Sequence, residues 1–280
     1  MGTDSALLNI KRVIFYIIPC LLLFITDSQA ASYSKDLAFR GYYKCSFSGI
    51  PFAKAGIHTE QNAQNYSATA DIILTGVVSL FTSHSSHTTV DGSGKDYAYS
   101  TSEYETNYKT KKKKRYVKIN YKGEKFDQET LIPPESPTKR TPVSTEQKHG
   151  SFDPLSALLK ARMLLINALE KGEKTFRLNV YDGRRLTQVD FTLLSTRTIR
   201  MEGKKVPVVA VQAKRTLLAG FTKSELADHD PKEPPMIMYF SNDEKLFPVR
   251  LETNLSFGTL TADLYKTCNA QESCLLGNKE

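Results

Sequence analysis

The sequence predicts a mainly β protein, in which one strongly curled antiparallel sheet, a half-barrel or spiral, wraps around one central α-helix. Two observations lead to this fold. Along most of the 280 residues, short apolar segments are separated by glycine, proline and Asp-Gly turn signals, a pattern typical of antiparallel strands. Only residues 153–172 have the spacing of a long apolar helix. The alternative is two stacked β-rich lobes divided at residues 129–150.

The first 30 residues have the order of a secretory signal peptide. Lys11 and Arg12 precede a low-charge run at 13–26, and Ser28-Gln29-Ala30 is a small-x-small cleavage sequence. As a helix, this run would cover only about 21 Å of a bilayer core of about 30 Å. We therefore expect export to the periplasm with cleavage near Ala30, leaving residues 31–280 as a single β-rich periplasmic domain.

Composition excludes several protein classes. Hydrophobic residues make up 40% of the chain and charged residues 24%, which argues against a disordered, a collagen-like or a polytopic membrane protein. There are 38 Lys and Arg against 30 Asp and Glu, so the net charge is +8. Seven positive charges fall within 109–118, so the excess describes one local surface.

The amino-terminal half reads as successive strands. Residues 39–70 predict two or three strands, and 69–82 predict either a strand with a bulge at Gly76 or a short helix. Asp91-Gly92-Ser93-Gly94 is expected to be a turn, followed by long strands near 95–108 and 114–121. The segment 129–150 contains four prolines, and we expect a proline-rich loop there.

The central helix has clear boundaries. Asp153 is a natural N-cap, Pro154 fits the first helical position, and Lys171-Gly172 is a typical end. Strands are then expected at 176–181, 186–194, 206–214, 236–240, 247–252 and 255–266, with a hairpin turn at Asp182-Gly183.

Three cysteines remain after the predicted cleavage, namely Cys45, Cys268 and Cys274. An oxidising compartment favours at least one disulfide. Pairing of Cys268 with Cys274 would close a small loop, whereas pairing of Cys45 with either would tie the two ends of the mature chain together. Spacing does not choose between these pairings.

Four short motifs occur in order along the chain: 152–159 (FDPLSALL), 181–185 (YDGRR), 218–221 (LAGF) and 246–250 (LFPVR). With these motifs, residues 38–266 resemble the DUF3108 family, a set of exported proteins of Gram-negative bacteria. The resemblance implies a periplasmic, β-rich protein. It supplies no catalytic residue.

Two groups of residues are candidates for binding. The apolar face of the predicted helix is expected either to be core or to line a cleft for an acyl chain. Its residues are Leu155, Leu158, Leu159, Met163 and Ile166. The basic run is expected either to be a solvated edge that prevents aggregation or to contact an anionic membrane surface. Its central residues are Lys111, Lys112, Lys113, Lys114 and Arg115.

Catalytic motifs are absent from the sequence. There is no Gly-x-Ser-x-Gly, no His-Glu-x-x-His and no P-loop, and His84 and His87 lack a nearby set of further metal ligands. We therefore expect a non-enzymatic envelope protein without cofactor or metal, which binds a lipid-like ligand or an envelope protein on a concave β-surface, and no nucleic acid. The alternatives are a scaffold with a packed core and no ligand, and an unrecognised hydrolase.

Overall fold

The structure is a computed structural model that describes residues 32–276, except residues 124, 137, 231, 233, 270–273 and 275. The predicted signal peptide, 1–30, lies outside the described residues. Residues Tyr33–Glu280 form one compact unit. Within the described part, no helix is long and apolar enough to span a bilayer.

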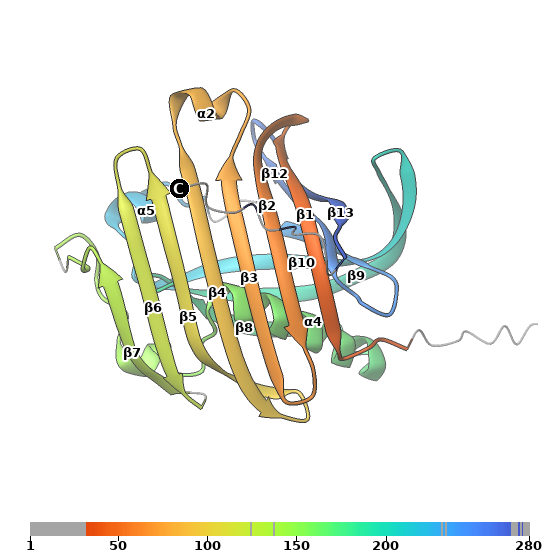
Figure 1. The fold of residues 1–280 in the computed structure, drawn as a ribbon, viewed down its shortest axis with the longest axis horizontal. Helices are drawn as coiled ribbons and strands as arrows, with labels where there is room; N and C mark the ends of the chain where they lie inside the picture. The colour runs from red at the N-terminus through yellow and green to blue at the C-terminus, as the bar shows by residue number, and fades with distance from the viewer. Residues whose placement is uncertain are drawn as a thin grey trace, which may run out of the picture. The chain divides into compact units, whose positions relative to one another are not determined.

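In the described part of the chain, thirteen antiparallel strands form one sheet (Figure 1). The strands are β1 (Leu37–Phe47), β2 (Ile50–Gln61), β3 (Asn65–Leu74), β4 (His84–Lys95), β5 (Ala98–Thr110), β6 (Lys114–Lys122), β7 (Lys125–Ile132), β8 (Thr175–Tyr181), β9 (Leu186–Met201), β10 (Lys204–Ala219), β11 (Met236–Ser241), β12 (Pro248–Leu255) and β13 (Gly258–Thr267). Their order in the sheet is β7-β6-β5-β4-β3-β2-β1-β13-β12-β11-β10-β9-β8.

One long-range pairing joins the two halves of the sheet. All neighbours in the strand order are consecutive in the chain except β1 and β13, which pair with Tyr43 opposite Leu264 and Cys45 opposite Ala262. Residues 129–150 therefore do not divide the protein into two lobes with separate sheets.

The long helix α4 (Pro154–Lys171) begins and ends as predicted. The Asp153 carboxylate accepts hydrogen bonds from the backbone N–H groups of Leu155 (3.0 Å) and Ser156 (2.9 Å), and Gly172 has φ 71° in the left-handed region. The other described helices are short: α2 (Val78–Phe81), α3 (Thr145–Lys148) and α5 (Lys223–Ala227).

Helix α4 packs against both halves of the sheet. It contacts β3 and β4 from the first half and β8 from the second, and Figure 1 shows it behind β3 and β4, on the side where β8 runs. Leu155 and Leu159 belong to a core cluster with β1–β6, whereas Leu165 and Ile166 belong to one with β8–β11. The two end strands also meet through side chains, because Tyr181 on β8 donates to Glu129 Oε2 on β7 at 2.7 Å.

Two expectations about turns and loops are wrong. Asp91–Gly94 lies within β4 rather than in a turn, and a Cβ at Gly92 would come within 2.2 Å of the Tyr66 ring, so a glycine there allows close packing of a neighbouring side chain. The chain turns instead at Asp96 and Tyr97, which both have positive φ. Residues 129–132 of the expected proline-rich loop belong to β7.

The mainly β, antiparallel fold with one long helix is confirmed. The strong curl of the sheet stays a prediction.

Candidate functional site

Two adjoining pockets lie on the strands of the second half, and we call them together the strand groove. The first has a volume of about 460 Å³. Its floor is formed by neighbouring strands β9 to β13, and His229, Asp230, Pro234 and Pro235 form a wall. Its lining residues are Val189, Phe191, Ala213, Lys214, Arg215, His229, Asp230, Pro234, Pro235, Met236, Met238, Thr253, Leu255 and Leu260.

The apolar floor of the groove is continuous with the core under α4. Phe191, Ala213 and Met238 line the pocket and also belong to the cluster that contains Leu165 and Ile166 of the helix. Strand pairing explains this continuity, since Ala213 is opposite Phe191 on β9 and Met236 on β11. The groove thus occupies the helix-facing side of these strands.

The second pocket extends the groove towards charged groups. Its volume is about 490 Å³. The residues that it shares with the first pocket are Arg215, His229, Asp230, Pro234 and Leu255. Phe257, on the connection between β12 and β13, also lines it and is 76% exposed. Arg185 and Glu225 form its polar end.

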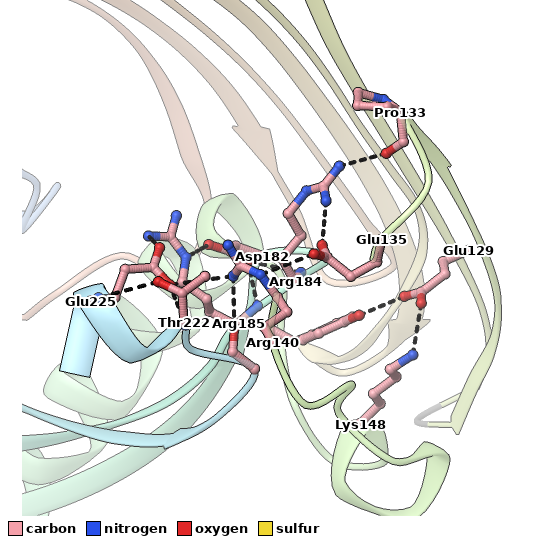
Figure 2. Close-up of polar contacts among 12 residues, drawn as sticks. Glu129, Pro133, Glu135, Arg140, Lys148, Asp182, Arg184, Arg185, Thr222 and Glu225 are labelled. Atoms are coloured by element: carbon pink, nitrogen blue, oxygen red, sulfur yellow. Dashed lines mark hydrogen bonds and ion pairs between the residues drawn. The ribbon is translucent and has the colours of Figure 1, made fainter. Parts of the chain in front are cut away.

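Figure 2 shows that this polar end belongs to a network of ion pairs that connects three parts of the chain. Arg185 contacts Asp182 at 2.8 Å and Glu225 at 3.4 Å. Partial burial acts to raise the pKa of Glu225, but the Thr222 backbone and the Arg140 charge outweigh it, and the pKa is lowered. Glu225 is therefore ionised and held by the protein itself.

The same network fixes the proline-rich segment. Glu135 pairs with Arg184 and with Arg140, the latter at 3.0 Å, and Arg140 Nη1 donates to the Gly220 carbonyl at 2.7 Å. Arg184 also donates to the Pro133 carbonyl at 2.8 Å. These bonds tie residues 133–140 to the β8–β9 turn and to the chain entering α5 (Figure 2).

His229 adds one polar atom to the groove wall. Its Nδ1 is buried and has no hydrogen-bond partner among the described residues, which is uncommon for a buried polar atom. His229 lines both pockets, at the junction of the apolar and charged parts.

The five helix residues predicted to line a ligand cleft lie in the core. Leu155, Leu159, Met163 and Ile166 are buried, and Leu158 is partly buried against the second cluster. The two pockets of the strand groove are lined by other residues. A ligand-lining role for these five stays a prediction.

The basic run lies at a hairpin tip. Lys111, Lys112, Lys113, Lys114 and Arg115 are all exposed where β5 passes into β6. This tip is remote in the strand order from the β9–β13 floor of the groove.

Of the three alternatives for the cysteines, the structure contains the Cys268–Cys274 disulfide, with the two Cα atoms 5.8 Å apart. Cys45 is a free, partly buried thiol, and its pKa is raised by burial and by Asp263. Among the described residues no group of three or more His, Cys, Asp or Glu is placed to hold a metal ion. His87 instead contacts Asp71 at 2.6 Å.

A family model described as "Protein of unknown function (DUF3108)" matches residues 39–265. The chain belongs to the DUF3108 family.

No curated protein matches this DUF3108 chain. Among solved structures, a β-barrel-like DUF1849 protein from Brucella abortus is 11% identical, with TM-score 0.49 over 82% of this chain and 97% of that chain. An exported-protein candidate with a YmcC-like fold from Bacteroides fragilis is 9% identical, with TM-score 0.32 over 85% of this chain and 99% of that chain.

The motifs that resemble DUF3108 have structural roles in this chain. Asp153 caps α4, and Asp182 accepts hydrogen bonds from the backbone N–H groups of Arg184 (2.9 Å) and Arg185 (2.8 Å) in the β8–β9 turn. A Cβ at Gly220 would lie 1.9 Å from the Arg184 carbonyl oxygen, and Leu246 is fully buried. These residues therefore have structural roles in this chain, while Arg185 and Phe221 of the same motifs also line the second pocket.

No local pattern in the sequence points to the residues of the strand groove. Asp228 and Asp230 are exposed loop residues, and both also line the second pocket. Successive side chains of a strand point to alternate faces. This predicts that Ala213 and Arg215 share a face of one strand and that Thr253 and Leu255 share a face of another. The register of the five paired strands is needed to place these residues around the strand groove.

Proposed function

We propose that this DUF3108 protein is an exported, non-enzymatic envelope protein that binds a lipid-like ligand, without a cofactor, on the concave side of a curled sheet. The strand groove is the site we assign to that ligand. The contact between Glu129 and Tyr181 on the two end strands supports the curl, and the signal-like first 30 residues support export.

The observation that carries the proposal is the continuity of the groove with the apolar core. Its first pocket, about 460 Å³, falls within the range of roughly 300–1,000 Å³ that is usual for small-molecule sites. An acyl chain on Phe191, Ala213 and Met238 would leave water at about 0.8 kcal/mol per CH₂. Its polar end would meet Arg215, which lies with His229 and Asp230 where the two pockets join.

The test compares two variants. One places a bulky side chain in the groove, and the matched variant places the same side chain on the opposite face of the sheet. Thr253 lines the groove and pairs with Leu260, whereas Thr261 is the next residue of β13 after Leu260 and points to the other face. Both are half-buried. Thr253→Phe and Thr261→Phe therefore make the same chemical change on opposite sides.

Binding is measured with cis-parinaric acid, a fluorescent fatty acid. We expect Thr253→Phe to weaken binding roughly tenfold or more, because an overpacked site typically costs 1–3 kcal/mol, and Thr261→Phe to bind like the wild type. Equal effects of the two substitutions would contradict the site. Absence of binding by the wild type, with no lipid found by native mass spectrometry of protein from the periplasmic fraction, would overturn the lipid-binding function and favour the packed scaffold.

A further inference from the structure

Four neighbouring strand connections form a row at one end of strands β12, β13 and β1–β6, and we call it the tip row. It comprises residues 48–49 between β1 and β2, residues 75–83 around α2, residues 111–113 between β5 and β6, and residues 256–257 between β12 and β13. Figure 1 shows the α2 tip and the β5–β6 tip at the same end of their strands.

Contacts between the tips establish that they are neighbours. Ser48 N donates to the Thr259 carbonyl at 2.7 Å, and Thr75 N donates to the Phe52 carbonyl at 2.8 Å. The ring centroids of Phe47 and Phe257 are 5.6 Å apart. At the other end of the row, the rings of His84 and Tyr108 are 4.1 Å apart.

Three of the four tips are apolar and uncharged. The segments 48–52 (SGIPF), 75–83 (TGVVSLFTS) and 255–259 (LSFGT) contain no charged residue. Each of them exposes a large hydrophobic side chain: Ile50 is 65% exposed, Val77 64% and Phe257 76%. Exposed apolar residues grouped in this way indicate a surface that meets a partner.

The fourth tip is strongly basic and rigidly built. Residues 106–122 contain no acidic side chain. Thr110 Oγ1 accepts hydrogen bonds from the backbone N–H groups of Lys112 (3.3 Å) and Lys113 (3.0 Å), so the turn holds its lysines outward. Lys109 and Lys114 are directly opposite one another in the sheet, a like-charge pairing that is destabilising and that an anionic partner would relieve.

The position of this tip removes the alternative explanation for its charge. Lysines on an edge strand prevent aggregation, but β5 and β6 are interior strands, and β7 is the edge of this side of the sheet. The lysines therefore do not protect an edge.

We infer that the tip row is a docking surface for an anionic phospholipid bilayer. The exposed side chains of Ile50, Val77 and Phe257 would enter the interface, while the lysines of the β5–β6 tip bind headgroup phosphates. Charge complementarity selects this partner, because the only charges in the row's turns are positive and they adjoin uncharged apolar tips. Phe257 also lines the strand groove, so the groove would open beside the membrane.

The contribution of the lysines to membrane binding is tested by sedimentation of the purified protein with vesicles. The vesicles consist of phosphatidylcholine, alone or with about one third phosphatidylglycerol. Lys112→Ser/Lys113→Ser is compared with Lys95→Ser/Lys125→Ser, which changes two exposed lysines beside the β4–β5 and β6–β7 connections, at the opposite end of these strands from the tip row. We expect the first pair to weaken binding to anionic vesicles by about 25-fold, since each lysine near a bilayer surface contributes about fivefold, and the second pair to leave it nearly unchanged.

The entry of the apolar tips into the membrane is tested by tryptophan fluorescence. Because the chain contains no tryptophan of its own, an introduced tryptophan is the sole source of the signal. Val77→Trp places a single reporter in the tip row, and Lys95→Trp places one at the opposite end of β4. Anionic vesicles should shift the emission of the Val77→Trp variant to shorter wavelength and leave that of Lys95→Trp in place. Equal binding to neutral and anionic vesicles, equal losses from the two lysine pairs, or no shift at Val77→Trp would each overturn the inference. None of these variants changes a lining residue of the groove, so fatty-acid binding remains a separate result.

Discussion

At the scale of single residues, Asp153 combines a structural role with an unfavourable charge. Its side chain is fully buried, and one carboxylate oxygen, Oδ1, caps α4 while Oδ2 has no partner among the described residues. Burial raises its pKa from 3.8 to about 6, although hydrogen bonds from Ser156 and Leu155 act to lower it. In the unfolded chain the same group titrates near 3.9.

The sign of the pH effect follows from this shift. Between about pH 4 and pH 6 the folded state holds a proton that the unfolded state has lost, so the contribution of Asp153 to stability falls as pH rises through that window. Asp153→Asn keeps a good N-cap without a charge. We expect the free energy of unfolding of the variant relative to wild type to rise between pH 4 and pH 7 by on the order of 2–3 kcal/mol. Urea unfolding at both pH values checks this, and a pH-independent difference would contradict it.

Arg162 is the second residue with a large expected effect. It is 1% exposed, and its guanidinium donates to the carbonyls of Lys245 (2.6 Å), Ser34 (2.5 Å) and Lys35 (3.3 Å). Burial lowers its pKa to about 10. The side chain thus ties α4 to the β11–β12 turn and to the segment before β1.

Arg162→Met removes the guanidinium, so the carbonyls of Ser34, Lys35 and Lys245 lose this hydrogen-bond donor. We expect a loss of about 3 kcal/mol or more in the free energy of unfolding, because each unpaired buried polar group costs about 1–3 kcal/mol. Lys160→Met, two residues away on the same helix, should cost less than about 1 kcal/mol. Guanidinium unfolding of both variants measures the difference, and similar losses would show that the carbonyl contacts contribute little.

At the scale of elements, the segment between β7 and α4 is held by specific bonds although its sequence suggested a loop. Prolines exclude a central strand there, and that inference holds for the described residues of 133–150, in which α3 is the one helix and no strand of the sheet occurs. Glu135 is the residue that joins the segment to the rest, through Arg140 and Arg184. Its partners are distant in sequence, so no local pattern predicted these pairs.

Glu135→Gln should loosen this segment without unfolding the sheet. We expect a loss of roughly 1–3 kcal/mol, because the largely buried Arg184 would lose its acidic partner and Arg140 would keep only Glu225 among the described acidic residues. We also expect faster hydrogen exchange in 136–150. The control is Asp127→Asn, whose partner Lys122 is 79% exposed and whose pair should contribute less than about 1 kcal/mol. Unchanged exchange in Glu135→Gln would contradict the role given to this network.

At the scale of the whole molecule, local patterns predicted the elements but not their long-range arrangement. Helix α4 was predicted from capping and periodicity, and both act within a few residues. The groove depends on which face each strand presents, and in β10 the consecutive residues Val208, Val209, Ala210 and Val211 are all buried. A strand buried on both faces has no alternation, so the sequence could not assign its faces.

The pairing of β1 with β13 was equally hidden, because it joins residues more than 200 positions apart. Together with α4, which belongs to the core clusters of both halves, it predicts that the halves unfold together. Two lobes that each had a separate sheet and core would unfold independently.

Two single-tryptophan variants distinguish these cases, since the chain has no tryptophan of its own. Phe126→Trp reports on β7 and Phe176→Trp on β8, the two ends of the strand order, and both phenylalanines are partly buried against different core clusters. Because the connected sheet and the shared helix couple both clusters, the urea midpoint of each tryptophan signal should equal the midpoint of the circular dichroism signal of the same variant. A tryptophan midpoint that departs from the circular dichroism midpoint in either variant would mean that the β1–β13 pairing and α4 do not couple the two halves.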